Sequence, residues 1–322
     1  MTLEREDFER LGLSPPTQEV LAVVQAMCAA PPMNTLGVDT ARANAGKRQS
    51  APAREEVHAV SEREIPVSGG TIRLRIYRPA PEGTLPCVVY FHAGGWILGG
   101  LDHSDHLCRR MANRSAAVVV NVDYRLAPEV TFPVPFDDSL AAVRWVRGNA
   151  DEIGIDPARI ALAGESSGGN LAAAVAQEIS RQEGGLAFLL LLEPALDMGQ
   201  SSRSWRELGA IFAPKTEQMA WMWGLYAPGK EMQDDPRVSP LAAPEIPAGH
   251  PATLVLAAEY DPLRDEAMAY ADRLRGAGIP VEARVEQGLP HAFCNMGGIL
   301  SRGQETFDAA VAATTDALRE DR

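Results

Sequence analysis

The sequence predicts an α/β fold, a mostly parallel central sheet flanked by helices on both faces. Three observations predict it. Short runs rich in Val, Leu and Ile recur along the chain, helix-like segments separate most of them, and most of the runs are apolar over several consecutive residues. Parallel strands covered on both faces have this continuous apolar character. The 322 residues are enough to bury a substantial core in one large domain or two small ones.

The predicted strands begin with a hairpin at residues 65–79, with Gly69 and Gly70 at its turn. Six further strands are expected at residues 86–93, 116–125, 159–165, 187–195, 252–260 and 281–287. The clearest helices are expected at residues 16–30, 136–150, 171–179 and 265–278. Residues 34–53 are polar and poor in strand signals.

One interval breaks the alternation of strands and helices. No clear strand lies between Leu196 and Pro251, yet five aromatic residues gather there: Trp205, Phe212, Trp221, Trp223 and Tyr226. Two interpretations stay open. The interval is either a helical insertion with its own small core, or a lid over a pocket at the carboxyl ends of the strands, where such sheets bind ligands.

Charge and composition exclude several classes of function. With 30 Lys and Arg against 43 Asp and Glu, the net charge of −13 argues against binding to nucleic acids or anionic membranes. The N-terminal residues 1–13 are charged where a signal peptide would be apolar, and no apolar run approaches 18 residues. We therefore expect a cytoplasmic protein that does not associate with a membrane. A homodimer is left open.

The four cysteines are scattered and form no C-x-x-C pair. A zinc site and a disulfide framework are therefore not expected, and no cofactor or metal is predicted. Cys87 lies in an apolar run and is expected in the core. Cys294 follows His291 by three residues, so it is either a site neighbour or, as we favour, a buried core residue.

The most informative segment is residues 159–169, RIALAGESSGG. An apolar run ends at Gly-x-Ser-x-Gly and a helix-like stretch follows, which is the context of a nucleophile elbow. The strained turn requires small residues two positions before and two after the nucleophile. Ser167 would place Glu165 at one of those positions, so the pattern favours Ser166.

A serine nucleophile needs a base, and the base needs an orienting group. Of six histidines, His291 follows a short strand and a turn near the C-terminus, at the same predicted sheet edge as the elbow. Asp261 directly follows the strand at 252–260. Three nearby carboxylates are alternatives, although only Asp261 falls at the expected strand end: Glu259, Asp265 and Glu266. The order Ser, Asp, His along the chain is that of α/β-hydrolases.

An oxyanion hole is the third requirement, because negative charge develops on the substrate carbonyl oxygen. Gly94 and Gly95 follow the strand at 86–93 and would supply two amide donors, and the amide of Ser167 would supply a third. We expect His92 to brace this loop rather than to act as a second base.

Together these segments resemble the hormone-sensitive-lipase-like (family IV) carboxylesterases of the α/β-hydrolase superfamily. The matching motifs, in family order, are HAGGW at 92–96, DYRLAPE at 123–129, FPVPFDD at 132–138, GESSGG at 164–169, DPLRDE at 261–266 and HAF at 291–293. The resemblance implies a triad of Ser166, Asp261 and His291 and an oxyanion hole of Gly94, Gly95 and Ser167.

The family also has a cap of N-terminal helices and an inserted segment. By resemblance, residues 1–50 are cap helices and 197–238 a cap insertion, while 51–196 and 239–322 form the catalytic domain. Trp96, Trp205, Phe212 and Trp221 are then expected at the substrate pocket.

Two departures from the family motifs concern the oxyanion hole. Ala93 replaces the first glycine of H-G-G-G, which is harmless if Ala93 needs no positive φ. Ser167 replaces the usual alanine, so its amide is kept and a hydroxyl is added near the site. Glu165 is expected to be a buried bracing carboxylate, and Arg125 and Glu129 to anchor a loop near the site.

The predicted function is a carboxylesterase that cleaves small esters of short acyl chains through an acyl-enzyme. An amidase or lactonase on the same triad is an alternative. A non-catalytic small-molecule receptor is a further one, although such receptors typically lose the triad histidine.

Overall fold

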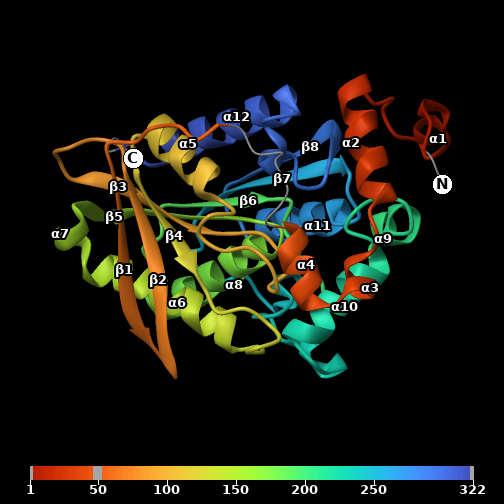
Figure 1. Cartoon of the computed structure of the whole chain (residues 1–322). Helices are drawn as coiled ribbons and strands as arrows, with labels where there is room; N and C mark the ends of the chain where they lie inside the picture. Colours follow the sequence, from red (N-terminus) through yellow and green to blue (C-terminus); the bar gives the residue numbers. More distant parts are fainter. Residues whose placement is uncertain (1–2, 46–52, 320–322) are drawn as a thin grey trace.

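The computed structural model describes residues 3–45 and 53–319, which contain one sheet of eight strands (Figure 1). The strand order is β1-β2-β4-β3-β5-β6-β7-β8. The strands are β1 Ala59–Val67, β2 Gly70–Arg78, β3 Leu85–Phe91, β4 Val118–Asp123, β5 Ile155–Glu165, β6 Phe188–Leu192, β7 Ala252–Tyr260 and β8 Val281–Pro290. Strands β3 to β8 run parallel, and β2 pairs antiparallel with β1 and β4. The predicted mostly parallel sheet is confirmed.

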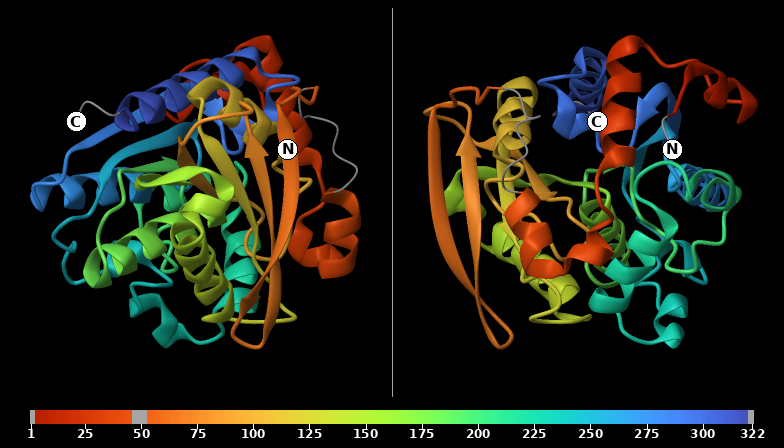
Figure 2. Two further views of the ribbon diagram at one scale, coloured as in Figure 1. Left: turned by 90° about the vertical axis from the view of Figure 1, so that its left-hand side faces the viewer. Right: turned by 45° about the vertical axis from the view of Figure 1, so that its right-hand side comes forward.

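Helices cover both faces of the sheet, as the two views of Figure 2 show. They are α5 Asp105–Ser115, α6 Val134–Gly148, α7 Ala150–Ile153, α8 Ser167–Gln182, α11 Arg264–Gly276 and α12 Ser301–Ala317. Helices α6, α8 and α11 contribute to one core cluster, and α5 and α12 to the other. In β3, Val89 and Phe91 face the first cluster while Val88 and Tyr90 face the second, so apolar residues on both sides of each strand are buried.

The hairpin differs in one detail from the prediction. Val67 pairs with Gly70, so Gly70 is the first residue of β2, and the two-residue turn consists of Ser68 and Gly69. Gly69 has φ +76°, a backbone conformation that glycine adopts without strain. Of the two glycines predicted at the turn, only Gly69 lies in it.

Several elements are longer than their sequence patterns. Strand β5 begins at Ile155 instead of residue 159, and β8 continues to Pro290, directly before His291. Helix α8 begins at Ser167, four residues earlier than expected. Close packing explains the glycines at its start, since a Cβ on Gly169 would lie 2.9 Å from the side chain of Pro194.

The N-terminal segment is helical. Its elements are α1 Arg5–Arg10, α2 Gln18–Ala29, α3 Met33–Leu36 and α4 Val38–Ala45. Helix α2 confirms the helix predicted at 16–30, whereas α3 and α4 lie in a stretch whose residue pattern predicted no helix and for which only the resemblance implied cap helices. Residues 1–2 and 46–50 of the predicted N-terminal cap segment lie outside the described residues.

The predicted strand-free interval contains α9 Arg203–Leu208, α10 Thr216–Tyr226 and the 3₁₀ helices η1 Lys230–Asp234 and η2 Pro240–Ala242. Helix α10 contacts α3 of the N-terminal segment. Phe8 of α1 packs against Phe212 and Tyr260, with ring centroids 5.5 and 4.8 Å away. The N-terminal segment and the interval after β6 are therefore packed together near the end of β7 (Figure 1).

Candidate active site

The sequence-predicted site residues follow four strands of the sheet. His92 follows β3, Ser166 follows β5, Asp261 follows β7 and His291 follows β8. These strands are parallel, so their carboxyl ends lie at the same edge of the sheet. Chain segments up to two hundred residues apart thereby meet at one edge, which is where open α/β sheets bind ligands.

Ser166 occupies the turn between β5 and α8 in a strained conformation, with φ 55° and ψ −116°. Its neighbours must be small. A Cβ on Gly164 would lie 2.2 Å from the carbonyl oxygen of Gly168, and one on Gly168 would lie 2.0 Å from that of Phe91. The amide of Ser166 donates to the carbonyl of Leu192 at 2.9 Å, which ties the turn to the end of β6.

His291 lies between the other two predicted triad residues. Its Nε2 is 3.1 Å from Ser166 Oγ, and its Nδ1 is 2.7 Å from Asp261 Oδ2. Asp261 is fully buried, whereas Ser166 and His291 keep 8% and 9% of their surface exposed. The second oxygen of Asp261 accepts the amide of Leu263 at 2.9 Å, which fixes the carboxylate. This is the geometry of a nucleophile, a base and an orienting acid.

The competing carboxylates are engaged elsewhere. Glu259 accepts the amides of Ser14 and Gly288 at 2.8 and 2.6 Å. Asp265 accepts the amide of Ser204 at 2.9 Å. Glu266 is buried and accepts the indole N–H of Trp205 at 2.7 Å. In the described structure, Asp261 is the one among these four that contacts His291.

The surroundings of His291 change its pKa in opposite directions. Burial lowers the pKa of the imidazole, while the charge of Asp261 and its hydrogen bond raise it, and the net pKa is raised above the ordinary value. Burial raises the pKa of two nearby carboxyls, Glu165 and Glu193. Both carboxyls also add to the rise in the pKa of His291, but Asp261 contributes most to it, through its charge and its hydrogen bond.

Glu193 is a site neighbour that the sequence analysis missed. It is fully buried at the end of β6, and its carboxyl accepts the amide of Ala292 at 2.9 Å and that of Phe293 at 3.4 Å. Its φ of 47° is positive, and so is the φ of 65° at Ala292. An acidic residue directly after an apolar strand, LLLLEP, was the available signal.

Glu165 is buried, as predicted, and pairs with Asn295. Cys294 is buried, and burial raises the pKa of its thiol, with Glu193 and Glu165 contributing. The cysteine thus lies in the core close to these carboxyls. Cys87 is fully buried, as predicted.

The loop after β3 depends on its glycines. Gly94 and Gly95 have φ of +133° and +63°, and a Cβ on Gly94 would lie 2.2 Å from the carbonyl oxygen of Leu98. A Cβ on Gly95 would lie 2.2 Å from Met222 Sδ, so α10 packs directly on this loop. Ala93 is not among the described residues with positive φ, so alanine can replace the first glycine of the family motif without backbone strain.

His92 is fully buried, and burial lowers the pKa of its imidazole to about 4. Its Nδ1 lies 2.9 Å from the carbonyl oxygen of Ala93, and its ring stacks on Tyr124 with centroids 4.3 Å apart. These contacts suit the bracing role expected of it.

Ser167 makes a contact that its amide alone does not predict. The amide of Gly95 donates to Ser167 Oγ at 2.9 Å. In the described part of the chain, the amides of Gly94 and Ser167 have no hydrogen-bond acceptor. Of the three amides predicted for the oxyanion hole, two are therefore without an acceptor and the third, that of Gly95, is hydrogen-bonded to Ser167.

The loop contacts predicted for Arg125 and Glu129 are present. Arg125 pairs with the buried Asp138 at 2.6 Å, and Glu129 accepts two hydrogen bonds from Arg42 at 2.6 and 2.8 Å. Arg42 also donates to the carbonyl of Ile97 at 2.9 Å, so α4 is fastened to the loop that carries Gly94 and Gly95.

The aromatic residues predicted at the pocket are mostly buried in packing contacts. Trp205 is 3% exposed and bonded to Glu266, and Phe212 is 1% exposed between Phe8 and Tyr260. Trp96 is fully buried against two aromatic residues of α10, Trp223 at 4.1 Å and Tyr226 at 4.6 Å between ring centroids. Trp221 is half-buried. Contact of any of them with substrate stays a prediction.

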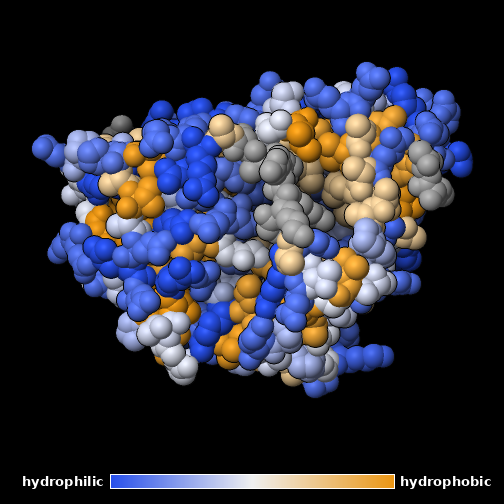
Figure 3. Space-filling view, viewed as in Figure 1, coloured by the Kyte–Doolittle hydropathy of each residue, from blue (hydrophilic) through white to orange (hydrophobic). Residues whose placement is uncertain are grey.

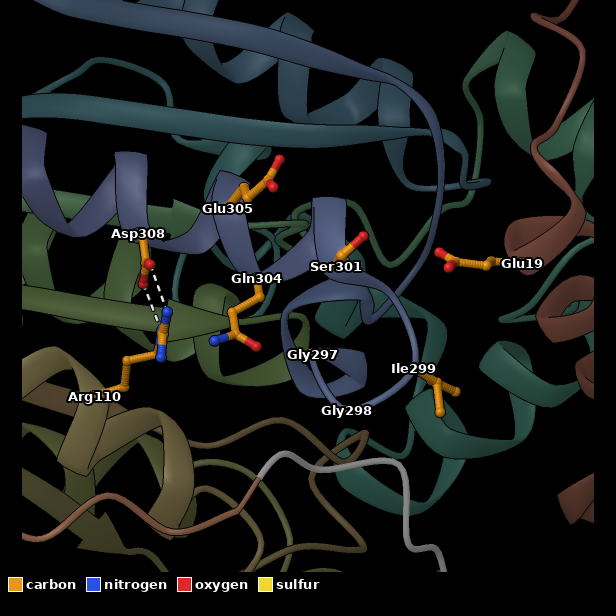
Figure 4. Close-up of a pocket in the computed structure, with 9 residues that line it drawn as sticks. All are labelled: Glu19, Arg110, Gly297, Gly298, Ile299, Ser301, Gln304, Glu305 and Asp308. Atoms are coloured by element: carbon orange, nitrogen blue, oxygen red, sulfur yellow. Dashed lines mark hydrogen bonds and ion pairs between the residues drawn. The ribbon is translucent and has the colours of Figure 1, made fainter.

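Two cavities of the structure lie away from Ser166. One of about 390 Å³ is lined by residues of α5, α12 and the loop before α12 (Figure 4). Its Arg110 already pairs with Asp308 at 2.5 Å, which leaves that charge neutralised. A second cavity of about 630 Å³ lies between the start of α2, the end of β8 and the start of α12. Neither contains a triad residue.

Polar residues dominate the face seen in Figure 3, and apolar groups form several smaller patches, one of them at the upper right over the N-terminal helices. Among the described residues, Val60 and Ile299 are the exposed large apolar side chains. None of the described helices has the length and apolar character that a bilayer span requires. No group of three His, Cys, Asp or Glu suited to a metal ion occurs within residues 3–45 and 53–319.

The chain is similar to known proteins of the α/β-hydrolase fold. A family model described as an alpha/beta hydrolase fold matches residues 88–295. The chain is 39% identical over 294 residues to the carboxylesterase NlhH of Mycobacterium tuberculosis, covering 88% of this chain and 90% of that protein.

Two further proteins extend the likeness over nearly the full length. The chain is 32% identical over 314 residues to an ethyl acetate hydrolase of Pseudomonas putida, covering 94% and 98% of the two chains. An ester hydrolase from the metagenome of Lake Arreo, solved with a phosphonate derivative of bipyridine, superposes with a TM-score of 0.89. It is 37% identical, with 94% of this chain and 98% of that chain covered.

Proposed function

The chain belongs to the hormone-sensitive-lipase-like family of the α/β-hydrolase superfamily, and from this premise we propose that it is a serine carboxylesterase. The single observation that carries the proposal is His291, which lies within hydrogen-bond distance of both Ser166 Oγ and Asp261 Oδ2. Three relatives that cover most of the chain are named as ester-cleaving enzymes.

In the proposed reaction, Ser166 Oγ attacks the ester carbonyl while His291 Nε2 takes the serine proton. The tetrahedral oxyanion collapses, the C–O bond to the alcohol breaks, and His291 returns the proton to the leaving alcohol. Water then attacks the carbonyl of the acyl-enzyme and gives its proton to His291. The bond to Ser166 Oγ breaks, the acid is released, and His291 returns the proton to Ser166. Asp261 keeps the Nδ1 proton of His291 in place and stabilises the imidazolium.

Amide donors stabilise the oxyanion in this proposal. The free amides of Gly94 and Ser167 are available, and Gly95 becomes available when it leaves the Ser167 hydroxyl. The amides of Gly94 and Ser167 are preset by the fold and cost no reorganisation when the charge develops, whereas Gly95 must first give up its hydrogen bond to Ser167.

We also propose that residues 1–50 and 197–238 form the cap, with the rest of the chain as the catalytic domain. Support comes from α10, whose Met222 packs on Gly95, and from Arg42 of α4, which is bonded to the same loop. The low exposure of Ser166 and His291 favours small esters of short acyl chains.

The test compares three substrates of similar size: p-nitrophenyl acetate, p-nitroacetanilide and a γ-lactone. A carboxylesterase turns over the ester with a burst of p-nitrophenol equal to the enzyme concentration, and it hydrolyses the amide and lactone far more slowly. Faster amide or lactone cleavage would identify one of the alternative hydrolases. Binding without turnover would identify a receptor.

A further inference from the structure

The hydroxyl of Ser167 accepts a hydrogen bond from one of the amides proposed for the oxyanion hole, and the loop that carries Gly94 and Gly95 is called the oxyanion loop below. Gly95 N–H donates to Ser167 Oγ at 2.9 Å, and Ser167 is fully buried. The amide of Ser167 itself begins α8. One residue thus offers an amide to a substrate oxyanion while its side chain holds a second amide away from it.

A buried phenol braces the start of the same loop. Tyr124 donates to the carbonyl of His92 at 2.8 Å. Tyr124 in turn stacks on His92, two residues before Gly94. The hydrogen bond between Gly95 and Ser167 therefore lies in a buried loop whose first residue, His92, is braced by Tyr124.

We propose that the hydroxyl of Ser167 slows ester hydrolysis, because it competes with the substrate oxyanion for the hydrogen bond of the Gly95 amide. This rests on the proposed esterase function. In the family the chain resembles, the position usually holds alanine, which has no hydroxyl to compete.

The physical basis is a difference between two hydrogen bonds. A bond to an oxyanion is charge-assisted and stronger than one to a neutral hydroxyl, so the amide transfers to substrate in the transition state. The hydrogen bond between Gly95 and Ser167 must be broken in each turnover, so its free energy is subtracted from the stabilisation of the transition state. Because the full charge exists only in the transition state, the effect falls on kcat more than on KM.

The experiment is Ser167→Ala, with all rates expressed per active site titrated by the p-nitrophenol burst. We expect kcat/KM for p-nitrophenyl acetate to rise about fivefold, or ~1 kcal/mol at 1.36 kcal/mol per tenfold. Ser167→Gly also removes the hydroxyl and should raise kcat/KM as well, which keeps the test valid if the alanine variant folds poorly.

Ser139→Ala is the matched control. Ser139 is also fully buried, and its hydroxyl donates to the carbonyl of Pro135 at 2.7 Å within α6. Its loss removes a buried hydroxyl of the same kind without touching the oxyanion loop, so kcat/KM per active site should stay unchanged.

A trifluoromethyl ketone gives a second readout, since it forms an oxyanion on the nucleophile. Its inhibition constant should fall in Ser167→Ala by the same factor by which kcat/KM rises. An unchanged or reduced kcat/KM together with an unchanged inhibition constant would overturn the proposal. Absence of turnover in the wild type would instead overturn the esterase function, and this inference with it.

Discussion

The Nδ1 of His291 lies 2.7 Å from Oδ2 of Asp261, although the two residues are 30 positions apart. They meet because β7 and β8 are neighbouring parallel strands and each residue directly follows its strand. The pair depends on strand order and strand length, and the continuation of β8 to Pro290 brings the imidazole level with the carboxylate.

Asp261→Asn should keep the shape of the site but leave His291 in the wrong tautomer. We expect kcat to fall on the order of 10⁴-fold, as in other triads. Asp265→Asn is the control, because Asp265 binds the amide of Ser204 and not the imidazole. Steady-state kinetics on p-nitrophenyl acetate measure both. Normal activity in Asp261→Asn with a large loss in Asp265→Asn would show that the wrong carboxylate was chosen.

The pH dependence follows from the raised pKa of His291. The free base is the active form, so kcat/KM should fall as pH drops through this pKa, and the midpoint should lie above the ordinary 6.5. In Asp261→Asn the residual activity should have a lower midpoint, because the charge of Asp261 that raises the imidazole pKa is lost while burial still lowers that pKa. A wild-type midpoint well below 6.5 would contradict the assignment of Asp261 as the stabilising charge.

Glu193 should position the turn that carries His291. Glu193→Ala leaves the amides of Ala292 and Phe293 without their acceptor, a loss of about 1–3 kcal/mol of stability for each buried group. We expect kcat to fall up to about 100-fold as the imidazole shifts. Glu193→Gln keeps one acceptor and should lose less. Thermal unfolding and kinetics per active site distinguish the two, and full activity in Glu193→Ala would remove the residue from the site.

Acyl length should be limited by the packed segments around the site. Each methylene gains up to about 0.8 kcal/mol while the pocket can bury it. Beyond about hexanoyl we expect kcat/KM on p-nitrophenyl esters to fall, because further chain must displace packed rings. A steady rise out to palmitoyl esters would instead indicate an open groove.

The sheet could be predicted from the sequence because its buried strands are apolar on both sides, as Val88 and Val89 of β3 illustrate. The grouping of Ser166, Asp261 and His291 was predictable for a related reason. Each directly follows a strand, apolar for Ser166 and Asp261 and partly charged for His291, and parallel strands end at one edge. The local strand patterns were therefore enough to predict that residues far apart in the sequence lie close together.

Other features depend on tertiary contacts that no local pattern contains. Gly95 and Ser167 are 72 positions apart, and their hydrogen bond depends on how the loop after β3 meets α8. Helix α4 has little apolar character, and its Ala41 is buried while Arg42 is fastened to Ile97. The pocket aromatics were harder still, because burial in a helix interface and exposure in a pocket require the same residue types.

The most direct measurement is covalent labelling with diethyl p-nitrophenyl phosphate, followed by intact mass and peptide mapping. The account predicts one diethylphosphoryl group per chain, attached to Ser166, with loss of esterase activity in proportion to labelling. Ser166→Ala should bind no phosphoryl group and lose about 10⁶-fold in kcat. Labelling at Ser167, or full activity in Ser166→Ala, would contradict the assignment of the nucleophile.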